Sequence, residues 1–189
     1  MSSDTDPMLL PNVAEPFVAP ADRDMLPSER RAFVLTHRTS VFGYRRRHDG
    51  PAMSVVHYVP TDGDELLVST TAGRAKASAV TRNPRVSLCV LDERWPFAYV
   101  QVYAEATVDH DRALAVDLLA AVAGRISGQP VSDDARPFLE AMAAQEDRVV
   151  LRCRPYATFA PSHRHPGEET AGAAPEVPGN VAWDAPDPG

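Results

Sequence analysis

The clearest pattern of hydrophobic and polar positions lies in residues 98–109. Apolar side chains alternate there with aromatic and polar ones: Val100, Val102, Ala104, Ala106 and Val108 alternate with Tyr99, Gln101, Tyr103, Glu105 and Thr107. Because successive side chains of a strand point to opposite faces, the alternation predicts a long strand with one face in the core. The other face is polar and aromatic, which is typical of a surface that meets water, a ligand or a second subunit.

Five shorter runs predict further strands, at residues 39–45, 52–59, 65–71, 85–91 and 149–154. The first two are separated by Asp49-Gly50, a strong hairpin signal. Helical patterns begin at Ser28, Arg74, Arg112 and Asp133, and in the first of these helices we expect Arg30 and Arg31 to face water. Six strands joined mostly by hairpins, with helices between them, predict a mainly β (α+β) fold, a small antiparallel barrel with helical inserts.

The two ends of the chain differ in composition from its middle. Residues 1–25 are interrupted by four prolines, and residues 161–189 are rich in proline, glycine and acidic side chains. We therefore expect one domain, residues 26–160, between an extended or disordered N-terminal arm and a disordered acidic tail. The whole chain has a net charge of −7, but residues 26–165 alone sum to +2. Such a body tolerates an anionic ligand, and it lacks the strongly basic surface of a nucleic-acid-binding protein.

Several classes of protein are disfavoured by the sequence. No run of 18 apolar residues is present and the N-terminal segment is acidic, so we expect no membrane span, no signal peptide and a cytoplasmic location. Cys89 and Cys153 lie in apolar runs, which predicts reduced, buried thiols. His163-Arg164-His165 has no acidic or thiol partner at ligand spacing, so we interpret it as a solvated segment and expect no metal site.

A single lysine marks the strongest candidate for chemistry. Among 19 basic residues only Lys76 is not an arginine, and it ends the run Ser69-Thr70-Thr71-Ala72-Gly73-Arg74-Ala75-Lys76 between a strand-like and a helix-like segment. Hydroxyl groups, the N–H groups at a helix start, a guanidinium and an ammonium group together suit a phosphate. The alternative is a solvated loop that holds its lysine by chance, and the local residues alone favour neither interpretation.

The order of these elements resembles the pyridoxamine 5'-phosphate oxidase-like split-barrel superfamily over residues 26–160. The most specific part is residues 67–91, where a strand, a phosphate-contacting turn, a helix and the strand entry Asn83-Pro84-Arg85-Val86 follow one another. Within the superfamily the chain is most similar to the actinobacterial flavin/deazaflavin oxidoreductases, which commonly use coenzyme F420. The resemblance implies a six-stranded antiparallel split β-barrel that binds a flavin or deazaflavin.

The resemblance also implies which residues bind the cofactor. Ser69, Thr70 and Thr71 would hydrogen-bond its phosphate or ribityl chain, while Arg74 and Lys76 would neutralise the phosphate. The strand around residues 54–58 would line the flavin ring, through the residues Ser54, Val56 and Tyr58. The family usually builds its site between two subunits, so a homodimer is implied, with the long strand and nearby loop of the partner closing over the ring through Tyr99, Gln101, Trp95 and Phe97.

The implied activity is hydride transfer from reduced F420 to a small electron-poor organic substrate. The cofactor carries the hydride in such reactions, and the sequence contains neither a Gly-x-Ser-x-Gly elbow nor a His-Glu-x-x-His motif. We therefore assign no catalytic residue, and we interpret His57 and Tyr58 as half-buried strand residues rather than proton donors. Two alternatives stay open: an FMN-dependent pyridoxamine phosphate oxidase-like enzyme, and a non-enzymatic protein that binds a flavin, F420 or a tetrapyrrole-like ligand.

Overall fold

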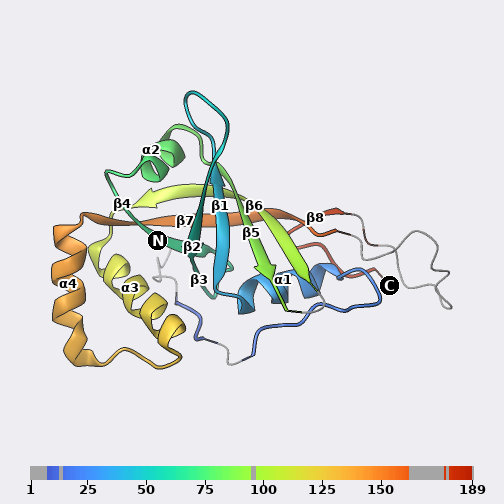
Figure 1. The fold of residues 1–189 in the computed structure, drawn as a ribbon, viewed down its shortest axis with the longest axis horizontal. Helices are drawn as coiled ribbons and strands as arrows, with labels where there is room; N and C mark the ends of the chain where they lie inside the picture. The colour runs from blue at the N-terminus through green and yellow to red at the C-terminus, as the bar shows by residue number, and fades with distance from the viewer. Residues whose placement is uncertain (1–7, 13–14, 95–96, 162–176, 178, 189) are drawn as a thin grey trace, which may run out of the picture.

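The computed structural model describes residues 8–12, 15–94, 97–161, 177 and 179–188. In this part of the chain eight strands form one antiparallel sheet, in the order β2-β1-β5-β6-β7-β4-β3, with β8 paired to β7 (Figure 1). The strands are β1 (Thr39–Tyr44), β2 (Ala52–His57), β3 (Val59–Pro60), β4 (Leu66–Thr71), β5 (Arg85–Asp92), β6 (Ala98–Asp109), β7 (Arg148–Phe159) and β8 (Asn180–Ala182). The helices are α1 (Pro27–Thr36), α2 (Ala75–Arg82), α3 (Arg112–Ser127) and α4 (Arg136–Gln145), with a 3-10 turn, η1 (Asp133–Ala135).

The sheet curls into a half-barrel, and the expected fold class is confirmed. Residues of β2 contact residues of β4 although these strands are not hydrogen-bonded neighbours, so the two sides of the sheet approach each other across an opening. The expectation of six strands is corrected by two short additions. One is β3, which has two residues, and the other is β8, which comes from the C-terminal segment.

The inner face of the sheet holds the main core, as the alternation in residues 98–109 predicts. The inward residues of β6 from Val100 to Ala106 are at most 1% exposed, and they pack with Phe42, Leu88 and Leu151 from neighbouring strands. Burial of this many apolar side chains is the main source of stability in such a domain.

Helices cover the ends and one outer face of the sheet (Figure 1). α1 buries Phe33 and Val34 at one end of the strands, and α2 adds Val80 to the core at the other. α3 packs on the outer face of β4 and β7 through Leu118, and α4 packs on α3. The carboxylate of Asp111 caps the N-terminus of α3 by accepting from the N–H groups of the first turn.

Parts of both terminal segments pack against the domain rather than lie outside it. In the N-terminal segment, Leu9 pairs with Thr61, and Ala19 and Met25 join the core at 5% and 1% exposure. In the C-terminal segment, Trp183 is 9% exposed and donates from Nε1 to Asp64 Oδ2 at 3.2 Å. The proposed solvated segment 163–165 lies outside the described residues.

The expectation that Arg30 faces water is wrong. Its side chain is 1% exposed, and it donates from Nε to Met25 O at 3.1 Å and from Nη1 to Gly179 O at 2.9 Å. The guanidinium therefore ties α1 to the two terminal segments. Arg31 is exposed, as predicted, and pairs with Asp64.

The two cysteines are free thiols, as expected, but they differ in burial. Cys153 is fully buried, and burial raises the pKa of its thiol to about 12. Cys89 is half-buried on β5, and burial raises the pKa of its thiol as well. Among the described helices, none is long and apolar enough to cross a membrane.

Candidate functional site

Lys76 lies in the first turn of α2, where its side chain reaches over the barrel core. It is 8% exposed, and its Nζ lies 5.7 Å from the centroid of the Phe42 ring on β1, a cation–π contact. No carboxylate in the described part of the chain forms an ion pair with Lys76. Burial, and secondarily the charge of Arg74, lower the pKa of Lys76 from its usual range. The lysine is thus a largely desolvated cation without a counter-ion.

Three hydroxyl groups on the inner face of the sheet, those of Ser40, Ser54 and Thr70, form no hydrogen bond with any described residue. Thr70 on β4 is 2% exposed, and Ser54 on β2 is paired in register with Phe42. Thr70 Oγ1 and Ser54 Oγ are both buried and form no hydrogen bond with any described residue. An unpaired buried hydroxyl costs about 1–3 kcal/mol, so each of these groups requires a partner from outside the described residues, a ligand or an ordered water.

These groups come from elements that meet at one end of the barrel. α2 contacts both β1 and β4, and β2 contacts β4 across the opening of the sheet. Phe42 is a neighbour of both Lys76 and Ser54, because its ring lies under the Lys76 ammonium and its position on β1 is paired in register with Ser54 on β2. We call Ser54, Thr70, Arg74 and Lys76 the α2 cluster.

The start of α2 adds further features that suit an anion. Arg74 is the exposed N-cap residue, and the described part of the chain gives it no ion pair. The backbone N–H groups of Ala75 and Lys76 likewise donate to no described acceptor. Free N–H groups at a helix start carry the positive end of the helix dipole, so they favour a phosphate or carboxylate.

The three hydroxyl residues expected to act together are divided between the two faces of β4. Thr70 points inward, while Ser69 and Thr71 lie on the outer face, because side chains alternate along a strand. Ser69 Oγ accepts from Arg148 Nη1 at 3.4 Å on that outer face. Thr70 is therefore the member of this run that shares a face with the α2 cluster.

The residues in and directly after β2 that were expected to line a flavin ring belong mostly to the core. Val56 is 8% exposed and Tyr58 is fully buried. The Tyr58 hydroxyl donates to Val34 O at 2.5 Å, and burial raises its pKa. This hydroxyl holds α1 against the sheet. The expectation that His57 and Tyr58 are half-buried is wrong for both, since Tyr58 is fully buried and His57 is exposed, with Nδ1 3.2 Å from Thr39 Oγ1.

A cavity of about 700 Å³ lies on the outer face of β1, β5 and β6. Its wall includes the basic hairpin loop 45–51 and the side chains of Met53, Cys89, Gln101, Tyr103 and Tyr156. Of the residues proposed to contact the ring from a partner, Gln101 lines this cavity, and Trp95 lies outside the described residues.

Tyr99 lies on the same face of β6 as Gln101 and forms an aromatic surface. Its ring centroid is 6.3 Å from that of Phe97 and 6.4 Å from that of Phe159. Phe97 is 55% exposed, and Met53 and Val55 on β2, which β1 and β5 separate from β6, are 72% and 73% exposed. Large apolar side chains that are exposed on one face of a sheet are typical of a binding face.

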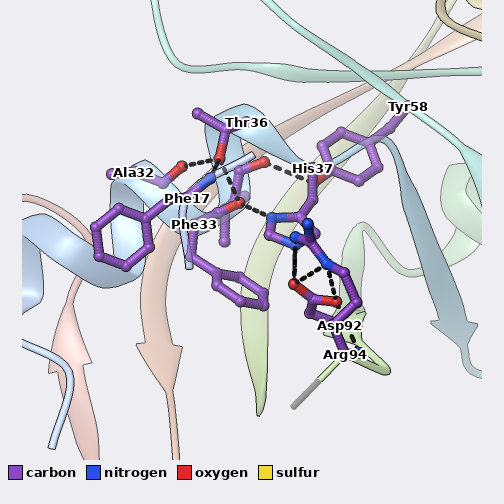
Figure 2. A network of polar contacts seen from close by, with 9 residues as sticks. Phe17, Ala32, Phe33, Thr36, His37, Tyr58, Asp92 and Arg94 are labelled. Carbon is purple, nitrogen blue, oxygen red and sulfur yellow. Dashed lines mark hydrogen bonds and ion pairs between the residues drawn. The ribbon is translucent and has the colours of Figure 1, made fainter. Parts of the chain in front are cut away.

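A second polar network, which the sequence did not reveal, joins the end of α1 to the end of β5 (Figure 2). His37 Nδ1 lies 2.7 Å from Phe33 O, and because a carbonyl only accepts, this nitrogen donates. His37 Nε2 faces Asp92 Oδ2 at 3.5 Å, and Arg94 donates to the same carboxylate from Nε and Nη2. The hydrogen bonds from Arg94 lower the pKa of Asp92 to about 2. The network fixes the start of the segment that leads to Phe97.

Comparison with known proteins identifies the fold. Residues 26–159 match the family model described as pyridoxamine 5'-phosphate oxidase. A conserved hypothetical protein from Mycobacterium tuberculosis is 24% identical with a TM-score of 0.64, over 82% of this chain and 98% of that chain. A putative pyridoxamine 5'-phosphate oxidase from Listeria innocua is 17% identical with a TM-score of 0.52, over 71% and 96% of the two chains. A protein of unknown function from Agrobacterium tumefaciens is 12% identical with a TM-score of 0.56, over 81% and 64%. These structures share the fold, and no functionally curated protein matches the sequence.

Proposed function

This chain belongs to the pyridoxamine 5'-phosphate oxidase family, and on that basis we propose that it is an oxidoreductase that binds coenzyme F420 at the α2 cluster. One observation carries the proposal: the desolvated ammonium of Lys76 forms no ion pair, and the buried hydroxyls of Thr70 and Ser54 no hydrogen bond, with any described residue, and the three lie on elements that contact one another. The resemblance of residues 67–91 to the flavin/deazaflavin oxidoreductases favours F420 over FMN.

Each residue of the α2 cluster has a distinct role in this proposal. Lys76 and Arg74 neutralise the phosphate of the cofactor, and the hydroxyls of Thr70 and Ser54 donate hydrogen bonds to its oxygens. The N–H groups at the start of α2 add donors that need no reorganisation. When bound, the deazaflavin ring supplies the hydride for a small electron-poor organic substrate. The protein holds the cofactor and excludes water from the reacting atoms.

We further propose that the protein acts as a cytoplasmic homodimer whose second subunit covers the outer face of the sheet, while the α2 cluster of each subunit holds the phosphate of the cofactor. The exposed apolar side chains of Met53, Val55 and Phe97 support a partner on the outer face of β2 and β6. This face also carries the cavity of about 700 Å³, which a second subunit would close. The two free thiols support a reducing compartment.

A fluorescence titration with F420 tests the cofactor site. Replacing Lys76 with alanine removes one charge-assisted contact, worth about 1.5–3 kcal/mol, so we expect Kd to rise by about 10- to 100-fold. Arg82→Ala is the matched control, because it removes an exposed cation from the far end of the same helix. Equal affinities for the wild type and Lys76→Ala would remove the α2 cluster from the account.

The family description supports FMN as the second candidate cofactor. The colour of the purified protein distinguishes the two candidates. From a host that lacks F420, an FMN protein purifies yellow, whereas an F420 protein purifies colourless. Tight binding of either cofactor without turnover of enones, quinones or bilins would instead favour a non-enzymatic binding protein.

A further inference from the structure

A separate cavity of about 560 Å³ lies between the N-terminal segment and the C-terminal end of α3. Its walls are mainly apolar and include Leu9, Leu10, Ala120, Ala121 and Val131. α3 packs on the outer face of β4, whereas α2 contributes to the core on the inner face, so this cavity is distinct from the α2 cluster (Figure 1). The volume lies in the range of small-molecule sites.

The backbone at the end of α3 shapes one side of the cavity. Gly128 ends the helix with a left-handed φ of 76°, and the chain then turns back past Gly124. A Cβ at Gly124 would lie 3.2 Å from Gln129 O, so a larger residue would push the returning segment away. Both glycines line the cavity together with Gln129 and Pro130.

Arg125 is the one charged side chain among the residues that line this cavity. It is 3% exposed, and its Nη2 donates to Leu10 O at 3.0 Å and to Pro11 O at 3.2 Å. Its Nε and Nη1 are buried and have no acceptor among the described residues, and no described carboxylate pairs with it. Burial, the largest influence, and the nearby charge of Arg38 both lower the pKa of Arg125.

A buried cation with only neutral acceptors is costly, and an anion relieves that cost. A carboxylate matches the planar donor fork of a guanidinium and forms two charge-assisted hydrogen bonds with it. Leu10 and Pro11 themselves line the cavity, so a ligand in it lies beside the carbonyl groups that now bond Nη2. A monoanion balances the single positive charge of the wall, and an apolar body matches the other side chains.

We propose that this cavity binds a small carboxylic acid with an apolar body, whose carboxylate pairs with the guanidinium of Arg125. The carboxylate accepts a hydrogen bond from Nη1, which has no acceptor among the described residues, and shares Nη2 with the carbonyl oxygens of Leu10 and Pro11. The site is independent of the proposed cofactor site, since it shares no residue with the α2 cluster.

Isothermal titration of the full chain with decanoate, and with 1-decanol as the uncharged probe, tests the proposal. We expect saturable binding of one decanoate per chain and at least tenfold weaker binding of 1-decanol. Arg125→Met removes the charge and Ala121→Phe fills the cavity while keeping Arg125, so each variant should weaken decanoate binding at least tenfold. Arg112→Met, an exposed cation at the other end of α3, should bind as the wild type does.

Two results would overturn the proposal. The titration overturns it if decanoate does not bind the wild type, if 1-decanol binds the wild type as tightly as decanoate does, or if decanoate binds both Arg125→Met and Ala121→Phe as tightly as the wild type. The other result comes from thermal denaturation without ligand, where we expect Arg125→Met to melt at a higher temperature than the wild type, because it removes an uncompensated buried charge. A lower melting temperature would identify Arg125 as a structural tie for the N-terminal segment.

Discussion

Replacing Thr70 with valine should stabilise the ligand-free protein and weaken cofactor binding at the same time. Thr70 is 2% exposed, and its Oγ1 has no partner in the described structure. An unpaired buried hydroxyl costs about 1–3 kcal/mol, and valine keeps the side-chain shape without the polar atom. We expect a gain of about 1 kcal/mol in the free energy of unfolding, or about 2–4 °C in melting temperature.

The same substitution removes a donor that the proposed phosphate requires. A hydrogen bond to a charged group is worth about 1.5–3 kcal/mol, so Kd for F420 should rise by about 10- to 100-fold. Urea denaturation measures the first effect and fluorescence titration measures the second. Opposite signs of the two effects are the signature of a ligand-binding group, because a purely structural residue would lose stability without a specific effect on binding.

Thr61 provides the matched control for this experiment. It is fully buried like Thr70, but its Oγ1 accepts from Glu65 N at 3.1 Å. Thr61→Val leaves that N–H group unpaired, so we expect a loss of about 1–3 kcal/mol in stability. If Thr70→Val destabilises the ligand-free protein as Thr61→Val does, or leaves the affinity for F420 unchanged, Thr70 is not a group that binds the cofactor.

Three further predictions concern other parts of the molecule. Hydrogen bonds from Arg94 lower the pKa of Asp92 to about 2, so the Asp92 carboxylate stabilises the fold above about pH 4 and loses this effect as the pH falls toward 2. The difference in unfolding free energy between wild type and Asp92→Asn, measured by urea denaturation, should therefore shrink between about pH 4 and about pH 2. A difference that stays constant over this interval would contradict the stabilising role of the carboxylate. Cys153, whose thiol pKa burial raises to about 12, should escape a thiol reagent at pH 8 until the protein unfolds, and mass spectrometry showing rapid native labelling would contradict its burial. Val55→Asp should convert the proposed dimer to a folded monomer, which light scattering would detect. Phe138→Asp, on the exposed face of α4, is the control and should stay a dimer. If Val55→Asp is still a dimer, the proposed interface is excluded.

The strands that alternate strictly could be predicted from sequence with little error. The long strand expected at residues 98–109 is observed as Ala98–Asp109, because its side chains satisfy a period of two throughout. The last strand was expected to end at Arg154, one residue before Pro155. It continues to Phe159 because a register shift between Tyr103 and Ala104 accommodates the proline opposite β6.

The errors concern groups whose partners lie far away in the sequence. Arg30 has the local setting of an exposed helical arginine, but its guanidinium is held by Gly179 O from the C-terminal segment. His37 and Asp92 come together only because α1 and the end of β5 meet in the fold. Local patterns do not encode such contacts, so the sequence did not predict them.

The candidate site was only partly predictable, because its composition is local in the sequence but its geometry depends on the fold. The composition of the run from Ser69 to Lys76 suited either an anion site or a solvated loop, and the sequence did not show that Thr70 Oγ1 is buried without a hydrogen bond to a described residue or that Lys76 packs over Phe42. The run did not reveal that Ser69 and Thr71 face away, which depends on the register of β4 in the sheet. Nor did it reveal the cavity on the outer face, which requires the curvature of the whole sheet.

A crystal structure of the protein soaked with F420 shows directly where the phosphate of the cofactor binds. We expect this phosphate within hydrogen-bonding distance of Thr70 Oγ1 and Lys76 Nζ, beside the start of α2. A phosphate bound instead by the hairpin loop 45–51, with the α2 cluster unchanged, would contradict this expectation.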